Sequence, residues 1–237
     1  MSKQRGTRKP TTDGWQNAVD QAQKQEKSAE VIVSGKTAGQ KTYIQEIQNN
    51  DIIFCTGPAG TGKTAIAVGM GLQMLAANKY QKIVIMRPAV EACNERIGFL
   101  PGSAEEKLSP FSAPVYDNME VFLPKMAVRA LAADGKIEIV PLGFARGRTF
   151  NKSYVIVDEA QDLTVKQTLL VLTRLGQESK MIFNGDLLQS DLFETNGLED
   201  AFVRLQGIKG LGFVTLDMAD IVRHHLIGQI LDRYVKR

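Results

Sequence analysis

Short apolar segments alternate along the chain with segments in which apolar residues recur at helical spacing. Several of the short segments are apolar throughout, which is typical of strands covered on both faces. Six are predicted as strands: Asp51–Thr56, Lys82–Arg87, Ile137–Leu142, Tyr154–Asp158, Met181–Asn184 and Phe213–Leu216. Four segments are predicted as helices: Lys63–Ala77, Leu123–Ala133, Thr164–Leu175 and His225–Val235. This alternation predicts an α/β fold, with a mostly parallel sheet that carries helices on both faces.

Two regions depart from the alternation. Residues 1–35 are rich in Lys, Gln, Ser and Thr and hold few large apolar side chains, so they are predicted to form a flexible basic arm. Residues 36–237 are predicted to form one domain. Within it, the proline-containing segment Gly98–Asn118 is predicted as a long functional loop.

Composition sets limits on the class of protein. The 237 residues are 43% hydrophobic and 23% charged, as in an ordinary globular protein with a sizeable core. The net charge of +3 owes much to four basic residues among the first ten, so overall charge does not indicate nucleic-acid binding. Cys55 and Cys93 are too few for a disulfide framework or a cysteine-based zinc site. Without an apolar leader or an 18-residue apolar run, we expect a cytoplasmic protein that neither is secreted nor spans a membrane.

The first motif is the run GPAGTGKT, Gly57–Thr64, which satisfies the phosphate-loop pattern G-x-x-x-x-G-K-[ST] between a predicted strand and a predicted helix. Its glycines allow backbone N–H groups to converge on an anion, and the helix adds its positive end. Lys63 is placed to reach the β- and γ-phosphates, and the Thr64 hydroxyl to bind Mg²⁺. The predicted nucleotide-binding residues are Gly57, Pro58, Ala59, Gly60, Thr61, Gly62, Lys63 and Thr64.

The second motif is YVIVDEAQD, Tyr154–Asp162, an apolar strand that ends in acidic residues. Asp158 is therefore expected at the carboxyl edge of the sheet, where ligands bind in open α/β folds. It is predicted to hold Mg²⁺ together with Thr64, while Glu159 is predicted to polarise an attacking water. A solvated strand end is the other account of these carboxylates.

The third motif is NGDLLQ, Asn184–Gln189, after the predicted strand Met181–Asn184. A polar side chain that leaves the sheet edge here could sense the γ-phosphate, and Gln189 is predicted to act with the catalytic residues. By itself the motif is also compatible with a Gly-Asp turn that has no chemical role.

Taken in order, GPAGTGKT, RPAVEACNERIGFLPG, RGRT, VDEAQD, GDLLQSDL and DIVRH resemble the PhoH family of P-loop ATPases from about Gly39 to the C-terminus. This family is similar to the first ATPase domain of superfamily 1 helicases. The resemblance implies a RecA-like core in which the strand Met181–Asn184 lies between the phosphate-loop strand and the Asp158 strand. It also implies ATP and Mg²⁺ as cofactors and Gln40 as a reader of adenine. A surface glutamine that begins a helix is the other account of Gln40.

Arginines are candidates because hydrolysis spreads negative charge over the γ-phosphoryl oxygens. Arg223, in MADIVRHH, resembles the arginine motif beyond the core of related helicases and is predicted to be catalytic. Arg87, Arg146 and Arg148 are candidates for nucleic-acid contact or for reaching a neighbouring subunit's nucleotide, and each has an ordinary surface or ion-pair role as its alternative. Helicases bind ATP between two such domains, so we expect a homo-oligomer, plausibly a hexameric ring, with an arginine supplied in trans.

Aromatic and basic residues interleave in the irregular segments, a pattern compatible with the binding of single-stranded nucleic acid. They are Phe99, Lys107, Phe111, Tyr116, Phe144, Arg146, Arg148 and Phe150. Core positions for Phe99 and Phe144 and ordinary loop positions for the rest explain the pattern equally well. Binding of single-stranded RNA or DNA is therefore expected chiefly from the family resemblance.

The sequence thus predicts an ATP-hydrolysing, helicase-like protein whose activity depends on nucleic acid, with RNA the favoured polynucleotide. One alternative is a P-loop phosphotransferase such as a nucleoside kinase, because thymidine kinases also combine a phosphate loop with DEAQ. They usually carry cysteine pairs for zinc, which this chain lacks. The other alternative is an ATP-gated scaffold with little turnover, against which Glu159 argues.

Overall fold

The computed structural model describes residues 31–88, 113–192 and 195–222, together with Leu226 and Arg233. All of them belong to one compact unit, Val31–Arg237. Residues 1–30 of the predicted arm lie outside the described residues. Most of the predicted helix His225–Val235 lies outside them as well. Those two predictions and the division of the chain into arm and domain therefore stay predictions.

The described strands form a single six-stranded sheet in the order β3-β2-β4-β5-β1-β6, and every neighbouring pair is parallel. The strands are β1 (Ile52–Thr56), β2 (Lys82–Arg87), β3 (Ile137–Pro141), β4 (Ser153–Val157), β5 (Lys180–Gly185) and β6 (Leu211–Thr215). Each coincides with a predicted strand to within about two residues. As the resemblance implied, β5 lies between the phosphate-loop strand β1 and the Asp158 strand β4.

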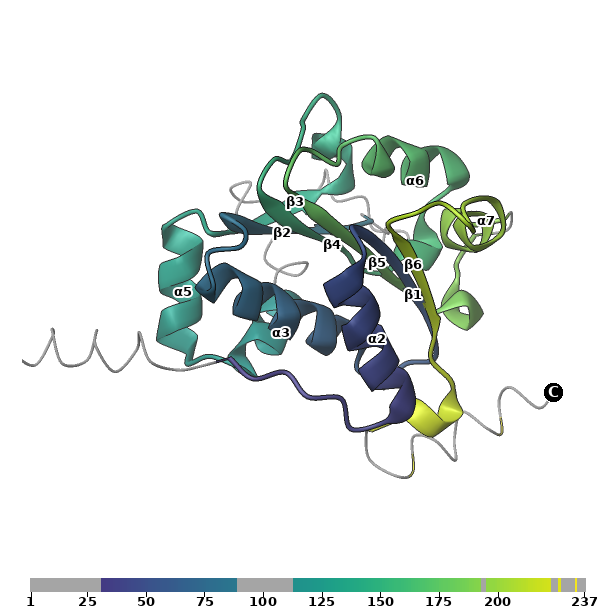
Figure 1. The fold of residues 1–237 in the computed structure, drawn as a ribbon, viewed down its shortest axis with the longest axis horizontal. Coiled ribbons are helices and arrows are strands. Elements are labelled where there is room, and N and C mark those ends of the chain that lie inside the picture. Colours follow the sequence, from purple (N-terminus) through teal and green to yellow (C-terminus); the bar gives the residue numbers. More distant parts are fainter. Residues whose placement is uncertain (1–30, 89–112, 193–194, 223–225, 227–232, 234–237) are drawn as a thin grey trace, which may run out of the picture. The chain divides into compact units, whose positions relative to one another are not determined.

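Helices cover both faces of the sheet, as Figure 1 shows. On one face lie α2 (Ala38–Asn49), α3 (Lys63–Ala76) and α5 (Lys125–Ala133); on the other lie α6 (Val165–Leu172) and α7 (Gly197–Arg204). Short 3-10 helices are η3 (Leu142–Ala145), η4 (Ala160–Asp162), η5 (Leu187–Gln189) and η6 (Met218–Asp220). This layered arrangement confirms the predicted fold class, a RecA-like α/β fold.

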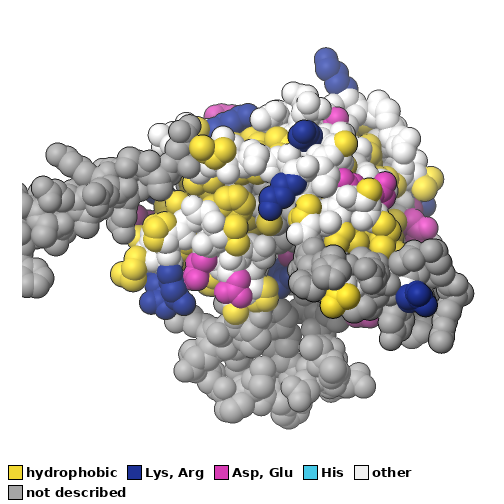
Figure 2. Space-filling view, turned by 90° about the horizontal axis from the view of Figure 1, so that it is seen from below, with side chains coloured by type: hydrophobic (Ala, Val, Ile, Leu, Met, Phe, Trp, Pro, Cys, Tyr) yellow, Lys and Arg dark blue, Asp and Glu magenta, His cyan; other side chains and the backbone are white. Residues whose placement is uncertain are grey.

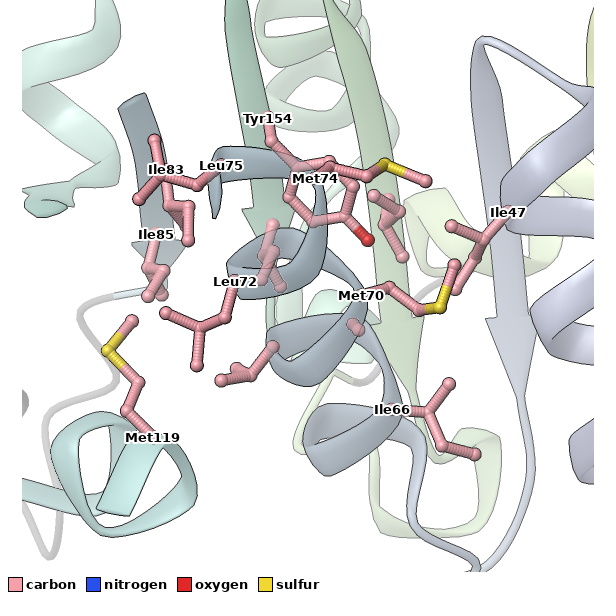
Figure 3. Packing of buried hydrophobic residues seen from close by; sticks show 14 of the residues in the cluster. Ile47, Ile66, Met70, Leu72, Met74, Leu75, Ile83, Ile85, Met119 and Tyr154 are labelled. Carbon is pink, nitrogen blue, oxygen red and sulfur yellow. The ribbon is translucent and has the colours of Figure 1, made fainter. Parts of the chain in front are cut away.

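The sheet separates two apolar clusters, because its strands are buried on both faces. In the cluster beneath α3, Leu72 and Leu75 lie on the side of β2, whereas Met70 points toward Ile47 of α2 (Figure 3). Met70, Met74 and Leu75 of α3 therefore belong to the core. On the opposite face the ring of Phe54 stacks on Phe183, with 4.8 Å between ring centroids.

Helix α6 begins as predicted but is shorter. Its N-cap is Thr164, whose hydroxyl accepts from the Gln167 backbone N–H in a capping box. The predicted end at Leu175 is wrong, because the helix ends at Leu172. The residues that follow pair with another segment instead: the Arg174 carbonyl accepts from the N–H of Phe150 at 2.9 Å.

Helices α2 and α7 were not predicted. Each begins after a side chain that caps it: Thr37 accepts from the Gln40 N–H, and Asn196 accepts from the Glu199 N–H. Both caps are sequence signals of a helix start. In α2 most residues are polar, and only Gln40, Tyr43 and Ile47 are buried.

The face that carries α2, α3 and α5 shows hydrophobic side chains among separated basic and acidic ones (Figure 2). Basic side chains do not gather into one patch on the described part of this face. None of the helices in the described ranges combines the length and the apolar character needed to cross a bilayer.

Candidate functional site

The first motif forms the loop between β1 and α3 at the carboxyl edge of the sheet. Gly62 is the N-cap of α3 and has a left-handed φ of 85°, which favours glycine. Helix α3 begins at Lys63, so its positive N-terminal end meets the loop. The Lys63 ammonium folds back over this loop and donates to the carbonyls of Gly57 at 2.5 Å and Pro58 at 3.1 Å. The loop therefore carries a cation at the start of a helix, an arrangement suited to an anion.

The second motif meets the first through Thr64. Its hydroxyl donates a 2.8 Å hydrogen bond to Asp158 Oδ1. Asp158 follows directly after β4, and its N–H continues the ladder by donating to the Met86 carbonyl. The residue is only 3% exposed, so burial raises the pKa of its carboxyl group, while the nearby Arg87 guanidinium opposes that rise.

Glu159 has an uncommon backbone, with a left-handed φ of 56°. Its carboxylate is held from two sides: Arg87 Nη2 lies 3.2 Å from Oε1, and Gln161 Nε2 donates to Oε2 at 3.0 Å. The same Nη2 atom lies 3.1 Å from Asp158 Oδ2. Arg87, at the end of β2, thus lies between the two carboxylates and neutralises part of their charge.

The third motif is tied to the second by the Gln161 side chain. While its Nε2 donates to Glu159, its Oε1 accepts from the N–H of Asp186 at 3.0 Å. Gly185 permits this contact: a Cβ at this position would lie 2.9 Å from the Gln161 backbone nitrogen and 2.5 Å from Leu198. The signal that would have singled out Gln161 is its place in DEAQD, but its partner 25 residues away cannot be read from the sequence.

All three motifs line one cavity of about 400 Å³. Within this cavity Lys63 lies near three carboxylate side chains. Burial lowers the pKa of its ammonium, whereas the Cys55 thiol and the carboxylates of Asp186, Glu159 and Asp158 favour its charged form. The lining residues that the sequence predicted are Ala59, Gly60, Gly62, Lys63, Thr64, Arg87, Asp158, Glu159 and Gln189. Those it missed include Pro114, Asn118, Asn184, Asp186 and Val222.

Gln40 lies next to the phosphate loop rather than among the cavity-lining residues. It is 3% exposed, its Nε2 donates to the Thr61 carbonyl at 2.9 Å, and its Oε1 accepts from the Lys36 N–H at 2.8 Å. Both ends of the amide are therefore used within the protein, and the role in reading adenine stays a prediction.

The other predicted arginines fall into different settings. Arg148 pairs with Glu138 of β3 at 2.7 Å and lies over the Phe150 ring at 4.9 Å from its centroid. The hydrogen bond from Arg148, together with Lys82 on the same carboxylate, lowers the pKa of Glu138. Arg146 is exposed beside η3. Arg223 lies outside the described residues.

The aromatic candidates separate in the same way. Phe150 is 1% exposed and belongs to the core, so it is not available for stacking with a base. Phe144 is 72% exposed, which contradicts a core position for it. Tyr116 is partly buried against the apolar cluster beneath α3. Phe99, Lys107 and Phe111 lie outside the described residues.

Thr64 and Asp158, the residues that the sequence predicted to hold Mg²⁺, bring together oxygen atoms of the type that Mg²⁺ prefers. Across the described ranges, no group of three or more His, Cys, Asp and Glu side chains could hold a metal ion. The pair therefore fits an ion that keeps several waters and binds substrate phosphates, rather than one in an all-protein cage.

Comparison with known proteins finds the family model "PhoH: PhoH-like protein" over residues 32–235. The PhoH-like protein of Synechocystis sp. is 45% identical over 205 residues, which are 86% of this chain and 62% of that protein. The PhoH-like protein of Bacillus subtilis is 45% identical over 204 residues, 85% of this chain and 64% of that protein. The chain thus spans somewhat less than two thirds of the length of these relatives.

Among solved structures, the large terminase from a thermophilic bacteriophage is similar, with a TM-score of 0.52 and 13% sequence identity. The similarity covers 84% of this chain and 49% of the terminase chain. At that identity the likeness concerns the fold alone.

Proposed function

Because the chain belongs to the PhoH-like protein family, we propose that it binds ATP with Mg²⁺ in the cavity at the carboxyl edge of the sheet and hydrolyses it. The observation that carries the proposal is the convergence of three motifs on this one cavity. The phosphate loop, the Asp158–Glu159 pair and the end of β5 come from separate parts of the chain, and all line it. A phosphate loop, a metal-binding carboxylate and a water-polarising carboxylate are the parts that phosphoryl transfer to water requires.

The triphosphate is held by the first motif. Backbone N–H groups of Ala59–Thr64, at the N-terminal end of α3, bind its oxygens, and Lys63 turns from the Gly57 and Pro58 carbonyls to the β- and γ-phosphates. Thr64 and Asp158 would hold Mg²⁺. The ion would supply positive charge that offsets the negative charge developing during hydrolysis.

Water is activated by Glu159. Both oxygens of its carboxylate already have partners, Arg87 on one and Gln161 on the other. We infer that Gln161 keeps its bond and orients the carboxylate, while Arg87 leaves Oε1 and moves to the γ-phosphate charge. The exposed Oε1 is then free to accept a proton from the attacking water.

The test of this proposal is product analysis with the purified chain. ATP and Mg²⁺, supplied with no nucleoside, should yield ADP and inorganic phosphate in equal amounts, and replacing Lys63 with Met should abolish both. ADP that forms only after a nucleoside is added, together with a nucleoside monophosphate and without inorganic phosphate, would instead identify a phosphotransferase. Tight binding of ATP without any release of phosphate would identify a scaffold.

We propose in addition that single-stranded nucleic acid, RNA in particular, binds near η3 and stimulates hydrolysis. The support is the exposed pair Phe144 and Arg146, which offers a stacking surface and a cation just beyond β3. RNA oligonucleotides at low salt should raise the ATPase rate of the wild type and have a smaller effect on a Phe144→Ala, Arg146→Ala variant. An unchanged wild-type rate with every oligonucleotide would contradict this.

The family resemblance to one ATPase domain of a helicase supports a third element, a ring of identical subunits in which Arg223 of one subunit reaches the ATP of the next. Light scattering at several protein concentrations should show an oligomer, and the specific ATPase rate should fall on dilution. A monomer with an undiminished rate would contradict the ring and leave the ATPase proposal standing.

A further inference from the structure

Asn184 combines full burial with a place at the candidate site. It is the fifth residue of β5, it is 0% exposed, and it lines the cavity together with Lys63 and Asp158. Its Nδ2 group is buried and has no hydrogen-bond partner in the described part of the chain. A buried donor without a partner is unfavourable and uncommon, so it calls for an explanation.

The other end of this amide is fixed by Tyr43 of α2. The Tyr43 hydroxyl, buried beneath the sheet, donates a 2.5 Å hydrogen bond to Asn184 Oδ1. Burial, with the Cys55 thiol as the next contribution, raises the pKa of Tyr43 well above its usual value, so the phenol keeps its proton and remains a donor. Because Oδ1 is occupied in this way, the amide is oriented with its NH₂ group as the free end.

The register of the sheet places Asn184 between the two halves of the site. On one side it pairs with Cys55, two residues before Gly57 and the phosphate loop. On the other side Phe183 pairs with Val157, so that Asn184 stands level with Asp158, the next residue of that strand. A donor at this position lies between the loop that binds phosphates and the carboxylates assigned to metal and water.

We propose that Asn184 Nδ2 donates a hydrogen bond to a γ-phosphate oxygen of bound ATP, and that Tyr43 is the positioning residue that orients it. The inference rests on the proposed function and deepens it. ADP has no γ-phosphate and leaves the amide unpartnered, so the amide lets the site distinguish ATP from ADP. Gln189, another polar residue of the same motif, is exposed on η5.

The first measurement compares the affinity of wild type and Asn184→Ala for ADP and for a β,γ-imido analogue of ATP, both with Mg²⁺, by titration calorimetry. Loss of one hydrogen bond to a charged group should weaken binding of the analogue by about tenfold or more. The ADP affinity should stay within about twofold of wild type. If Asn184→Ala does not fold, Asn184→Asp serves in its place, since it keeps the shape but puts a carboxylate where the donor was.

The second measurement tests the role of Tyr43. Tyr43→Phe should cause a smaller, equally selective loss for the analogue, and in the Asn184→Ala background it should cause no further loss. Tyr154→Phe is the matched control: Tyr154 belongs to the same apolar cluster, and its buried hydroxyl has no partner among the described residues. This control should leave the ratio of the two affinities unchanged.

The outcomes separate the two proposals. If wild type binds neither nucleotide, the proposed function fails and this inference fails with it. If wild type binds both and Asn184→Ala weakens them equally, or weakens neither, the inference alone is overturned. If Tyr43→Phe acts as strongly in the Asn184→Ala background as in wild type, Tyr43 does not act through Asn184.

Discussion

The Thr64 hydroxyl donates to the Asp158 carboxylate across 94 positions of sequence, joining the first turn of α3 to the end of β4. The bond places one alcohol and one carboxylate oxygen side by side at the mouth of the phosphate loop. The bond also fixes the Asp158 carboxylate in its buried setting.

Thr64 can be tested by a change that keeps its shape. Thr64→Val removes the hydroxyl alone and should lower the Mg²⁺-dependent ATPase rate by roughly 10- to 100-fold, the range expected for one lost bond to a charged group. The Mg²⁺ concentration at half-maximal rate should rise as well. Thr64→Ser, which retains the hydroxyl, is the control and should stay near wild type. Equal rates for the Val and Ser variants would speak against a metal at this position.

Glu159 is expected to affect hydrolysis and not binding. Glu159→Gln removes the base but keeps an oxygen for Gln161, so single-turnover hydrolysis should fall by about 10²- to 10⁴-fold. The affinity for ATP should remain within a few-fold of wild type. Rapid-quench kinetics measures the first quantity and calorimetry the second. A variant that still releases phosphate at the wild-type rate would exclude Glu159 as the base.

Gly185 should be important for stability because two neighbours lie close to it. Gly185→Ala places a methyl group 2.5 Å from Leu198 and 2.9 Å from the Gln161 backbone nitrogen, and should lower the free energy of unfolding by about 1–3 kcal/mol. Gly143→Ala is the control, because nothing lies within 4 Å of its added methyl group. Urea denaturation should show less than about 0.5 kcal/mol of change for this control. A similar effect of both substitutions would contradict the packing argument.

Lys180 should make stability depend on pH. Its buried ammonium donates to the Asn50 carbonyl, and burial together with nearby Lys79 lowers its pKa to about 8. The unfolded chain keeps this proton up to about pH 10.4, so between these values the unfolded state binds more protons and stability rises with pH. Wild type should therefore gain in free energy of unfolding relative to Lys180→Met as pH is raised from about 7 to about 9.5.

The measurement is urea denaturation at several pH values, with Lys166→Met as the control because Lys166 is an exposed lysine. For that control the difference from wild type should stay constant across the same range. A constant difference for Lys180→Met would show that its proton is held equally in the folded and unfolded states.

Much of the fold could be predicted from the sequence because its signals are local. Buried parallel strands are short apolar runs, and the phosphate loop needs glycines and a lysine in fixed order. Helix α2 escaped prediction because it buries only Gln40, Tyr43 and Ile47, leaving a weak apolar stripe.

The site was harder to predict because its geometry depends on contacts between distant residues. Arg87 contacts Glu159 at a sequence separation of 72 residues, and Tyr43 contacts Asn184 at a separation of 141. No rule of residue spacing predicts either contact. Phe144 and Phe150 have the same residue type six positions apart, yet one is exposed and the other is core. Whether such a phenylalanine is buried depends on the elements that pack around it in the folded chain, which its immediate sequence does not show.

The position of β5 has a consequence for synthesis of the chain. Within the described sheet, strand β1 pairs only with β5 and β6, both of which follow it by more than a hundred residues. A nascent chain that has emerged as far as Val157 can pair β2 with β3 and β4. Strand β1, which precedes the phosphate loop, then has no neighbour in the sheet. The nucleotide site is therefore completed only after Lys180–Gly185 has been synthesised and has paired with both β1 and β4.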